Sequence, residues 1–146
     1  MTDTILILNG PNLNLLGRRE PHIYGTDTLD HIESLILVRA KELAIEIDMR
    51  QSNHEGQIID WIQKPGEKSS GILLNAGAYT HSSIAIYDAL KASSLPTIEV
   101  HLSNPHAREP FRHRSYVSPG SVGIISGFGA NSYLLALDAM ATLLSA

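Results

Sequence analysis

Residues 5–25 have the sequence ILILNGPNLNLLGRREPHIYG, and this stretch indicates both the fold and the position of a site. Ile5–Leu8 has the length and composition of a buried strand. The segment that follows, from Asn9 to Gly25, is much longer than the ~2–6 residues that usually connect elements of α/β proteins. Because long loops in compact domains are often functional, we expect a mobile lid that carries chemistry. Helix signals resume only near Thr26–Thr28.

Strand and helix signals alternate along the rest of the chain. Strands are expected at 45–49, 71–74, 97–101 and 122–125, helices at 29–43, 58–62, 82–90 and 133–144, and a polar loop over 105–119. Asp27 and Thr28 are both suitable N-caps for the first helix. This alternation predicts an α/β protein with a flavodoxin-like, doubly wound, five-stranded parallel sheet and helices on both faces. We expect a single catalytic domain over residues 1–146, since no repeat or linker is present.

The composition excludes several classes of protein. The chain has 146 residues, 43% of them hydrophobic and 18% charged, which is typical of a globular domain. A formal net charge of −4 argues against nucleic acid or an anionic membrane as the main partner. Without cysteine, disulfides and thiol nucleophiles are impossible. The N-terminal residues have no signal-peptide pattern and no apolar stretch reaches the ~18 residues of a bilayer span, so we expect a cytoplasmic protein.

Polar residues follow three of the predicted strands. Asn9–Asn12 follow the first strand, Asn75–Gly77 the third, and His101–Asn104 the end of the fourth. Ligands of open parallel sheets bind beyond the carboxyl ends of the strands, where these residues would meet. The histidines form no known metal motif, and no lysine stands at an apolar strand end, so neither a metal site nor a Schiff base is expected.

Tyr24 is the sharpest candidate for a catalytic base. A free phenol has a pKa near ~10 and is a poor base at neutral pH, but a nearby guanidinium favours the phenolate. Arg18 and Arg19 lie in the same loop, and a lid that brings Arg19 beside Tyr24 would create a base in an enclosed site. The same residues also fit a solvated charged turn in which the tyrosine only packs the loop.

His101 is a candidate acid because Glu99, two positions earlier, lies on the same face of a strand. A carboxylate in that position orients the imidazole and fixes its tautomer, and the alternative interpretation is a strand-end histidine that only bonds backbone. The Asn75 amide can hold a substrate hydroxyl or a water, and Asn12 can orient the tyrosine or the lid, although turn formation is the simpler explanation for either residue taken alone. The local basic cluster Arg108–Arg114 is suited to binding oxyanions or RNA. It also fits a solvated face without a ligand.

Together these segments resemble the type II 3-dehydroquinate dehydratases. The blocks that carry the resemblance are residues 9–25, 51–56 (QSNHEG), 75–83 (NAGAYTHSS), and 99–104 (EVHLSN) continuing to 108–112 (REPFR), in the order and near the spacing of the family. The resemblance implies a lyase of the shikimate pathway, in aromatic amino acid biosynthesis. That enzyme dehydrates 3-dehydroquinate to 3-dehydroshikimate through an enolate and needs no metal or organic cofactor.

The resemblance also implies a role for each site residue. Tyr24 matches the base and Arg19 the lid arginine that activates it, while His101 matches the acid that Glu99 orients. A water near Asn12 and Asn75 would stabilise the enolate. Binding roles are implied for the backbone of Leu102 and Ser103, which receives the carboxylate, and for three polar side chains, Asn75, His81 and Arg112.

The resemblance further implies a homododecamer, a tetramer of trimers, in which Asp88 reaches the site of a neighbouring subunit. The rival interpretation is a flavodoxin-like binding or signalling module without catalysis. A receiver domain would carry paired acidic residues after its first strand, and a flavin binder would carry a phosphate loop there. Asn9-Gly10-Pro11 stands at that place instead.

Overall fold

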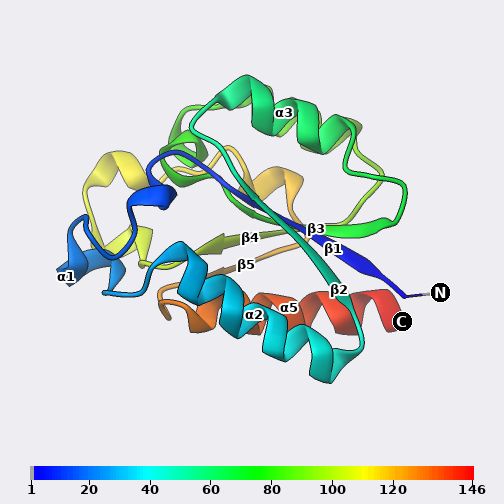
Figure 1. The fold of residues 1–146 in the computed structure, drawn as a ribbon. Helices are drawn as coiled ribbons and strands as arrows, with labels where there is room; N and C mark the ends of the chain where they lie inside the picture. The colour runs from blue at the N-terminus through cyan, green and yellow to red at the C-terminus, as the bar shows by residue number, and fades with distance from the viewer. Residues whose placement is uncertain (1) are drawn as a thin grey trace.

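The computed structural model describes residues 2–146, which form one parallel sheet covered by helices (Figure 1). The strands are β1 (Thr4–Asn9), β2 (Glu46–Gln51), β3 (Ser69–Asn75), β4 (Thr97–His101) and β5 (Gly123–Ser126). Their order across the sheet is β2-β1-β3-β4-β5, and every neighbouring pair is parallel. This is the strand order of the flavodoxin-like fold, so the predicted fold class is confirmed.

Helices cover both faces of the sheet. In Figure 1, α2 (Leu29–Leu43) and α5 (Asn131–Ser145) lie below the sheet and α3 (Glu55–Gln63) lies above it, where α4 (Ile84–Ala92) packs against α3. Along β1, Ile5 and Ile7 belong to the apolar cluster under α2 and α5, whereas Leu6 and Leu8 belong to the cluster under α3 and α4. Burial on both faces explains why this strand is a continuous apolar run.

The residues that cap α2 and α4 decide where these two helices begin. The Thr28 hydroxyl accepts a hydrogen bond from the His31 backbone N–H at 3.1 Å, so Thr28 rather than Asp27 caps α2. The Ser83 hydroxyl accepts in the same way from Ile86 at 2.9 Å, which makes α4 begin later than the predicted residue 82. β2 extends beyond its predicted end because it pairs with β1 as far as Gln51.

The lid contains regular structure that the sequence pattern did not predict. A 3₁₀ turn spans Leu13–Leu15 and a short helix, α1, spans Pro21–Tyr24. The expectation that helix begins only near Thr26 is therefore wrong. An element of four residues is too short to show helical periodicity, although Pro21 at its first position is a recognised signal. Three further 3₁₀ turns form in the polar loop and just beyond it, at Pro105–Ala107, Pro110–Arg112 and Ser118–Gly120.

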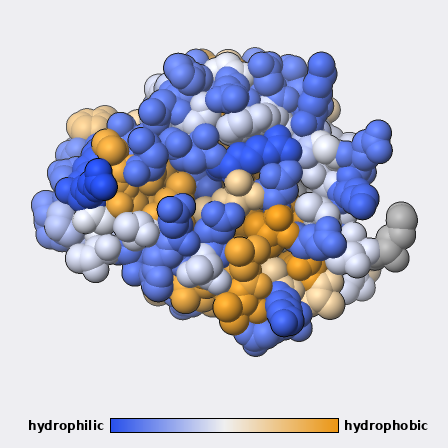
Figure 2. All heavy atoms as spheres, in the orientation of Figure 1, coloured by the Kyte–Doolittle hydropathy of each residue, from blue (hydrophilic) through white to orange (hydrophobic). Residues whose placement is uncertain are grey.

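The surface is uneven in polarity. Figure 2 shows mostly hydrophilic atoms over α3 at the top of this face and hydrophobic atoms over the region of α2 below. On α2, Leu37 and Val38 are exposed. Within residues 2–146, no helix has the length and hydropathy needed to cross a bilayer.

The turns after β1 and β3 lie in backbone contact. A Cβ atom at Gly10 would lie 2.3 Å from the Ala76 carbonyl oxygen, and the Gly10 N–H donates to the Asn75 carbonyl at 2.8 Å. Gly77, at φ 59°, would meet the backbone of Pro11 at 3.2 Å in the same way. Only glycine permits this approach, which places the loops that follow Gly10 and Asn75 side by side.

Gly10→Ala is therefore expected to destabilise the fold. Backbone cannot move aside as a flexible side chain can, so we expect a loss of about 3 kcal/mol in the free energy of unfolding, measured by urea titration. Gly56→Ala is the matched control, because Gly56 is exposed in α3 and a Cβ atom there would meet nothing within 4 Å. It should be neutral or stabilising by about 0.5–1 kcal/mol. Equal effects of the two changes would contradict the close-contact argument.

Candidate active site

A small cavity of about 60 Å³ opens at the carboxyl ends of β1, β3 and β4, beneath the lid. Eight of the eleven predicted site residues line it, namely Asn12, Arg19, Tyr24, Asn75, His81, His101, Ser103 and Arg112. Pro11, Gly77, Ala78, Pro105 and Arg108 complete the lining. Residues far apart in sequence thus meet at the edge of the sheet where the strand pattern placed them.

The other three predicted residues lie elsewhere. Glu99 stands behind His101, and Leu102 lines an adjoining hollow together with Tyr24 and Ser103. Asp88 is exposed on α4 and does not line the cavity of its own chain. Its predicted role in a neighbouring subunit stays a prediction.

The pair formed by Glu99 and His101 is almost fully buried. His101 ends β4, and strand alternation puts its side chain beside that of Glu99, with Nε2 2.5 Å from Oε2. Glu99 is 2% exposed and His101 is 7% exposed, so little water screens the pair. Because Nε2 faces the carboxylate, Nδ1 is the ring nitrogen left for another partner.

Two serines of the polar loop complete the surroundings of Glu99. The Ser115 hydroxyl lies 3.1 Å from each carboxylate oxygen, and the Ser118 hydroxyl donates to Oε1. Burial raises the pKa of the Glu99 carboxyl, but the hydrogen bonds and charge from His101 and the two serines outweigh burial and hold that pKa below its ordinary value. Sequence reasoning missed both serines, since nothing in a polar loop indicates which hydroxyls turn inward.

Ser118→Ala is expected to alter the dependence of stability on pH. A carboxyl with a lowered pKa in the folded state contributes stability above its ordinary pKa of 4.5, and this contribution is lost as pH falls through the folded value. The variant should be less stable at pH 7 by about 1–2 kcal/mol, and the difference from wild type should shrink at pH 3.

Urea unfolding at the two pH values, at one protein concentration, measures this effect. Ser121→Ala is the control, because among residues 2–146 the Ser121 hydroxyl bonds the Val117 carbonyl and not Glu99. A difference for Ser118→Ala that is the same at pH 3 and pH 7 would count against the charge argument.

Two guanidinium groups flank the ring of Tyr24. The Cζ atoms of Arg19 and Arg108 lie 5.0 Å and 4.9 Å from its centroid, within range of cation–π attraction. The Arg108 side chain is only 11% exposed; its Nη1 donates to the Ser103 hydroxyl at 3.2 Å, and its buried Nε has no hydrogen-bond partner within residues 2–146. Positive charge therefore reaches the phenol ring from two separate segments, the lid through Arg19 and the polar loop 105–119 through Arg108.

Sequence reasoning did not single out Arg108 as a site residue. It stood in the basic cluster, whose alternatives included a solvated face, and that interpretation is wrong for Arg108 and for Arg112, which line the cavity. The Arg112 side chain is 17% exposed and its Nε donates to Glu109 at 3.0 Å. The signal that could have found Arg108 was its place in one of the family-like blocks.

His81 and Asn12 are each held by groups outside the cavity. Burial lowers the pKa of His81, so its ring is neutral at neutral pH. Its Nδ1 lies 2.8 Å from the Arg114 carbonyl, which can only accept, so Nε2 is left as an acceptor. Asn12 adopts a left-handed conformation at φ 68°, and its N–H donates to the Asn53 side chain at 3.0 Å.

This arrangement suits proton transfer. Within the part of the chain that the structure describes, no group of three or more histidine or carboxylate side chains is placed to hold a metal ion. A phenol beside two guanidinium groups and an imidazole paired with a carboxylate face one small cavity. Such a site can remove a proton from one atom and give a proton to another.

Comparison with known proteins identifies the family. A family model described as dehydroquinase class II matches residues 3–141. The chain belongs to the class II dehydroquinase family. The predicted family and the predicted enzyme class, a lyase, are thus confirmed, and the rival interpretation as a binding or signalling module loses its support.

Individual relatives agree over nearly the whole chain. A 3-dehydroquinate dehydratase of Rhizobium etli is 56% identical over 140 residues, which cover 96% of this chain and 97% of the relative. A 3-dehydroquinate dehydratase of Sinorhizobium medicae is 56% identical over 143 residues, which cover 98% of this chain and 97% of the relative. The crystal structure of a type II dehydroquinase from Butyrivibrio crossotus superposes with a TM-score of 0.93 at 46% identity, covering 95% of this chain and 97% of that one.

Proposed function

We propose that this dehydroquinase removes water from 3-dehydroquinate to give 3-dehydroshikimate through an enolate, as a cytoplasmic step of the shikimate pathway. The observation that supports the mechanism best is the position of Tyr24, about 5 Å from two guanidinium groups and in the same cavity as the His101–Glu99 pair.

Tyr24 acts as the base in this proposal. Its phenolate takes a proton from the carbon beside the ketone, and the electron pair moves onto the ketone oxygen to form the enolate. Arg19 and Arg108 stabilise the phenolate, because each brings a positive charge close to the ring. Arg108 is the more buried of the two, with a side chain 11% exposed against 35% for Arg19, and each has an acidic neighbour, Glu109 at 3.8 Å and Glu20 at 3.6 Å.

His101 acts as the acid in the second half of the reaction. The enolate collapses to a conjugated enone as the hydroxyl departs, and His101 gives that hydroxyl a proton from Nδ1, so that it leaves as water. Glu99 stabilises the imidazolium before this transfer and keeps the ring oriented through Nε2. A water held by Asn12 and Asn75 donates to the enolate oxygen.

Substrate binding uses the remaining residues. The backbone N–H groups of Leu102 and Ser103 receive the carboxylate, and Ser103 N–H has no protein acceptor within residues 2–146. Arg112 supplies a fixed fork of donors for a hydroxyl. The neutral His81, whose Nε2 is an acceptor, binds a substrate hydroxyl as well.

Tyr24→Phe tests the base. We expect kcat, followed by the absorbance of the enone product, to fall by about 10²–10⁴-fold with little change in KM. The thermal unfolding midpoint should stay unchanged, because the Tyr24 hydroxyl makes no hydrogen bond to the described residues. Arg18→Ala is the control for lid substitutions, since Arg18 does not line the cavity. Turnover by the phenylalanine variant close to wild type would overturn the base assignment, and a wild type without turnover would make the protein an inactive scaffold.

Assembly into a dodecamer of four trimers is the second part of the proposal. The edge strand β5 and α5 expose an apolar groove of about 410 Å³, and Val122 and Ile124 on this edge are 60% and 54% exposed. Unpaired apolar edges favour association, so this edge supports contact between subunits. Asp88 is exposed and therefore free to reach a neighbouring site.

A complementation experiment tests the shared site. Asp88→Ala and Tyr24→Phe chains should each be impaired, but chains mixed in equal amounts and reassembled should recover about a quarter of wild-type activity, because that share of sites combines an intact tyrosine with an intact neighbouring aspartate. Light scattering on wild type should give about 190 kDa, twelve times the 15.9 kDa of one chain. A fully active monomer would contradict the proposal.

A further inference from the structure

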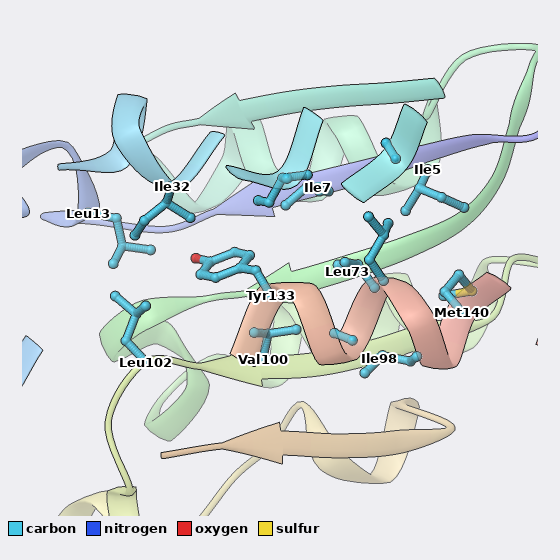
Figure 3. Close-up of a cluster of buried hydrophobic side chains, with 14 of the residues drawn as sticks. Ile5, Ile7, Leu13, Ile32, Leu73, Ile98, Val100, Leu102, Tyr133 and Met140 are labelled. Atoms are coloured by element: carbon cyan, nitrogen blue, oxygen red, sulfur yellow. The ribbon is translucent and has the colours of Figure 1, made fainter. Parts of the chain in front are cut away.

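The buried hydroxyl of Tyr133 has no part in the mechanism described above, yet it lies next to the site. Tyr133 belongs to the first turn of α5 and is 0% exposed. In Figure 3 its hydroxyl points toward the end of the apolar cluster that holds Leu13 and Leu102. Two amide side chains bond this hydroxyl: Asn9 at 2.6 Å and Asn75 at 2.9 Å.

These side chains form a row of hydrogen bonds that ends at a backbone group on each side, the Arg50 carbonyl and the Gly77 N–H. The two backbone groups fix which partner donates in every bond of the row. The Arg50 carbonyl can only accept, so Asn9 donates to it through Nδ2 at 3.0 Å and turns its Oδ1 toward Tyr133. The Tyr133 hydroxyl must then donate to Asn9, and its oxygen accepts from Asn75 Nδ2.

At the other end, the Gly77 backbone N–H can only donate, and it does so to Asn75 Oδ1 at 3.2 Å. The Arg50 carbonyl and the Gly77 N–H therefore require the same orientation of the Asn75 amide. Its oxygen faces Gly77, one N–H faces Tyr133, and the second N–H has no protein acceptor within residues 2–146. Asn75 lines the cavity, so this second N–H is a donor available to a molecule there.

The orientation matters because the two faces of an amide carry opposite partial charge. A donor N–H stabilises negative charge that develops on a substrate oxygen or on the water bound to it, whereas the amide oxygen would repel that charge. Burial raises the pKa of Tyr133, so its hydroxyl stays protonated and remains a donor to Asn9.

We infer that Tyr133 is a positioning residue, which acts with Asn9 to hold the Asn75 amide with an N–H toward the cavity and so favours the enolate. This inference rests on the proposed function, since the enolate is the anion to be stabilised. Neither Tyr133 nor Asn9 lines the cavity, so both act only through Asn75.

A double-mutant cycle on kcat tests this role. Tyr133→Phe should lower kcat about tenfold, less than the 10²–10³-fold typical of losing an oxyanion donor outright, while KM changes less than about threefold. In an Asn75→Ala background the same change should lower kcat by less than about twofold, because no amide is left to orient. Asn9→Ala should behave as Tyr133→Phe does in both backgrounds, and it carries the test if the phenylalanine variant does not fold.

Leu137→Ala is the control for loosened packing. Leu137 is fully buried on the same helix but makes no polar contact, so its removal should lower the unfolding temperature at least as much as Tyr133→Phe while kcat stays near wild type. A loss of kcat in Leu137→Ala equal to that in Tyr133→Phe would overturn the inference.

The other outcomes separate this inference from the proposed function. If wild type has no turnover, the proposed function fails and this inference fails with it. If wild type is active and Asn75→Ala is fully active, the role of Asn75 is wrong and dehydration stands. If Tyr133→Phe lowers kcat equally in both backgrounds, or in neither, the positioning role alone is overturned.

Discussion

The backbone contact between the turns that follow β1 and β3 is the constraint on which the site depends. Gly10 has no room for a side chain beside Ala76, and the two turns are joined by the hydrogen bond from Gly10 to Asn75. A wider separation would move the part of the lid that follows Pro11 away from the end of β3. The cavity exists because two loops approach more closely than side chains would permit.

Around that contact, each of the two proposed catalytic side chains, His101 and Tyr24, has charged groups beside it. The buried carboxylate of Glu99 is satisfied by His101, Ser115 and Ser118, so a charge that burial would penalise becomes a rigid support for the imidazole. In the same cavity, positive charge from Arg19 and Arg108 lies close to the aromatic ring of Tyr24. The two proposed proton transfers need a negative charge beside the acid, His101, and positive charge beside the base, Tyr24.

Local patterns predicted much of this structure. Apolar runs and alternation located all five strands, and both ends of β4 were predicted correctly. They could do so because buried strands and helices have apolar residues at a regular spacing along the sequence. The pairing of Glu99 with His101 followed from their spacing on one strand. The short helix in the lid was missed because four residues show no period, and Ser115 and Ser118 were missed because loop hydroxyls carry no sign of the direction in which they turn.

The sequence by itself determined the fold class, the family and most of the residues that line the cavity, because those depend on hydrophobic period and on motifs read along the chain. Only the tertiary structure decided that Arg108 joins Arg19 at Tyr24, and that Tyr133 connects Asn9 to Asn75. The physical reason is distance along the chain: 124 positions separate Tyr133 from Asn9. Hydrogen bonds of this kind form only after the sheet and α5 have packed, and no local pattern records them.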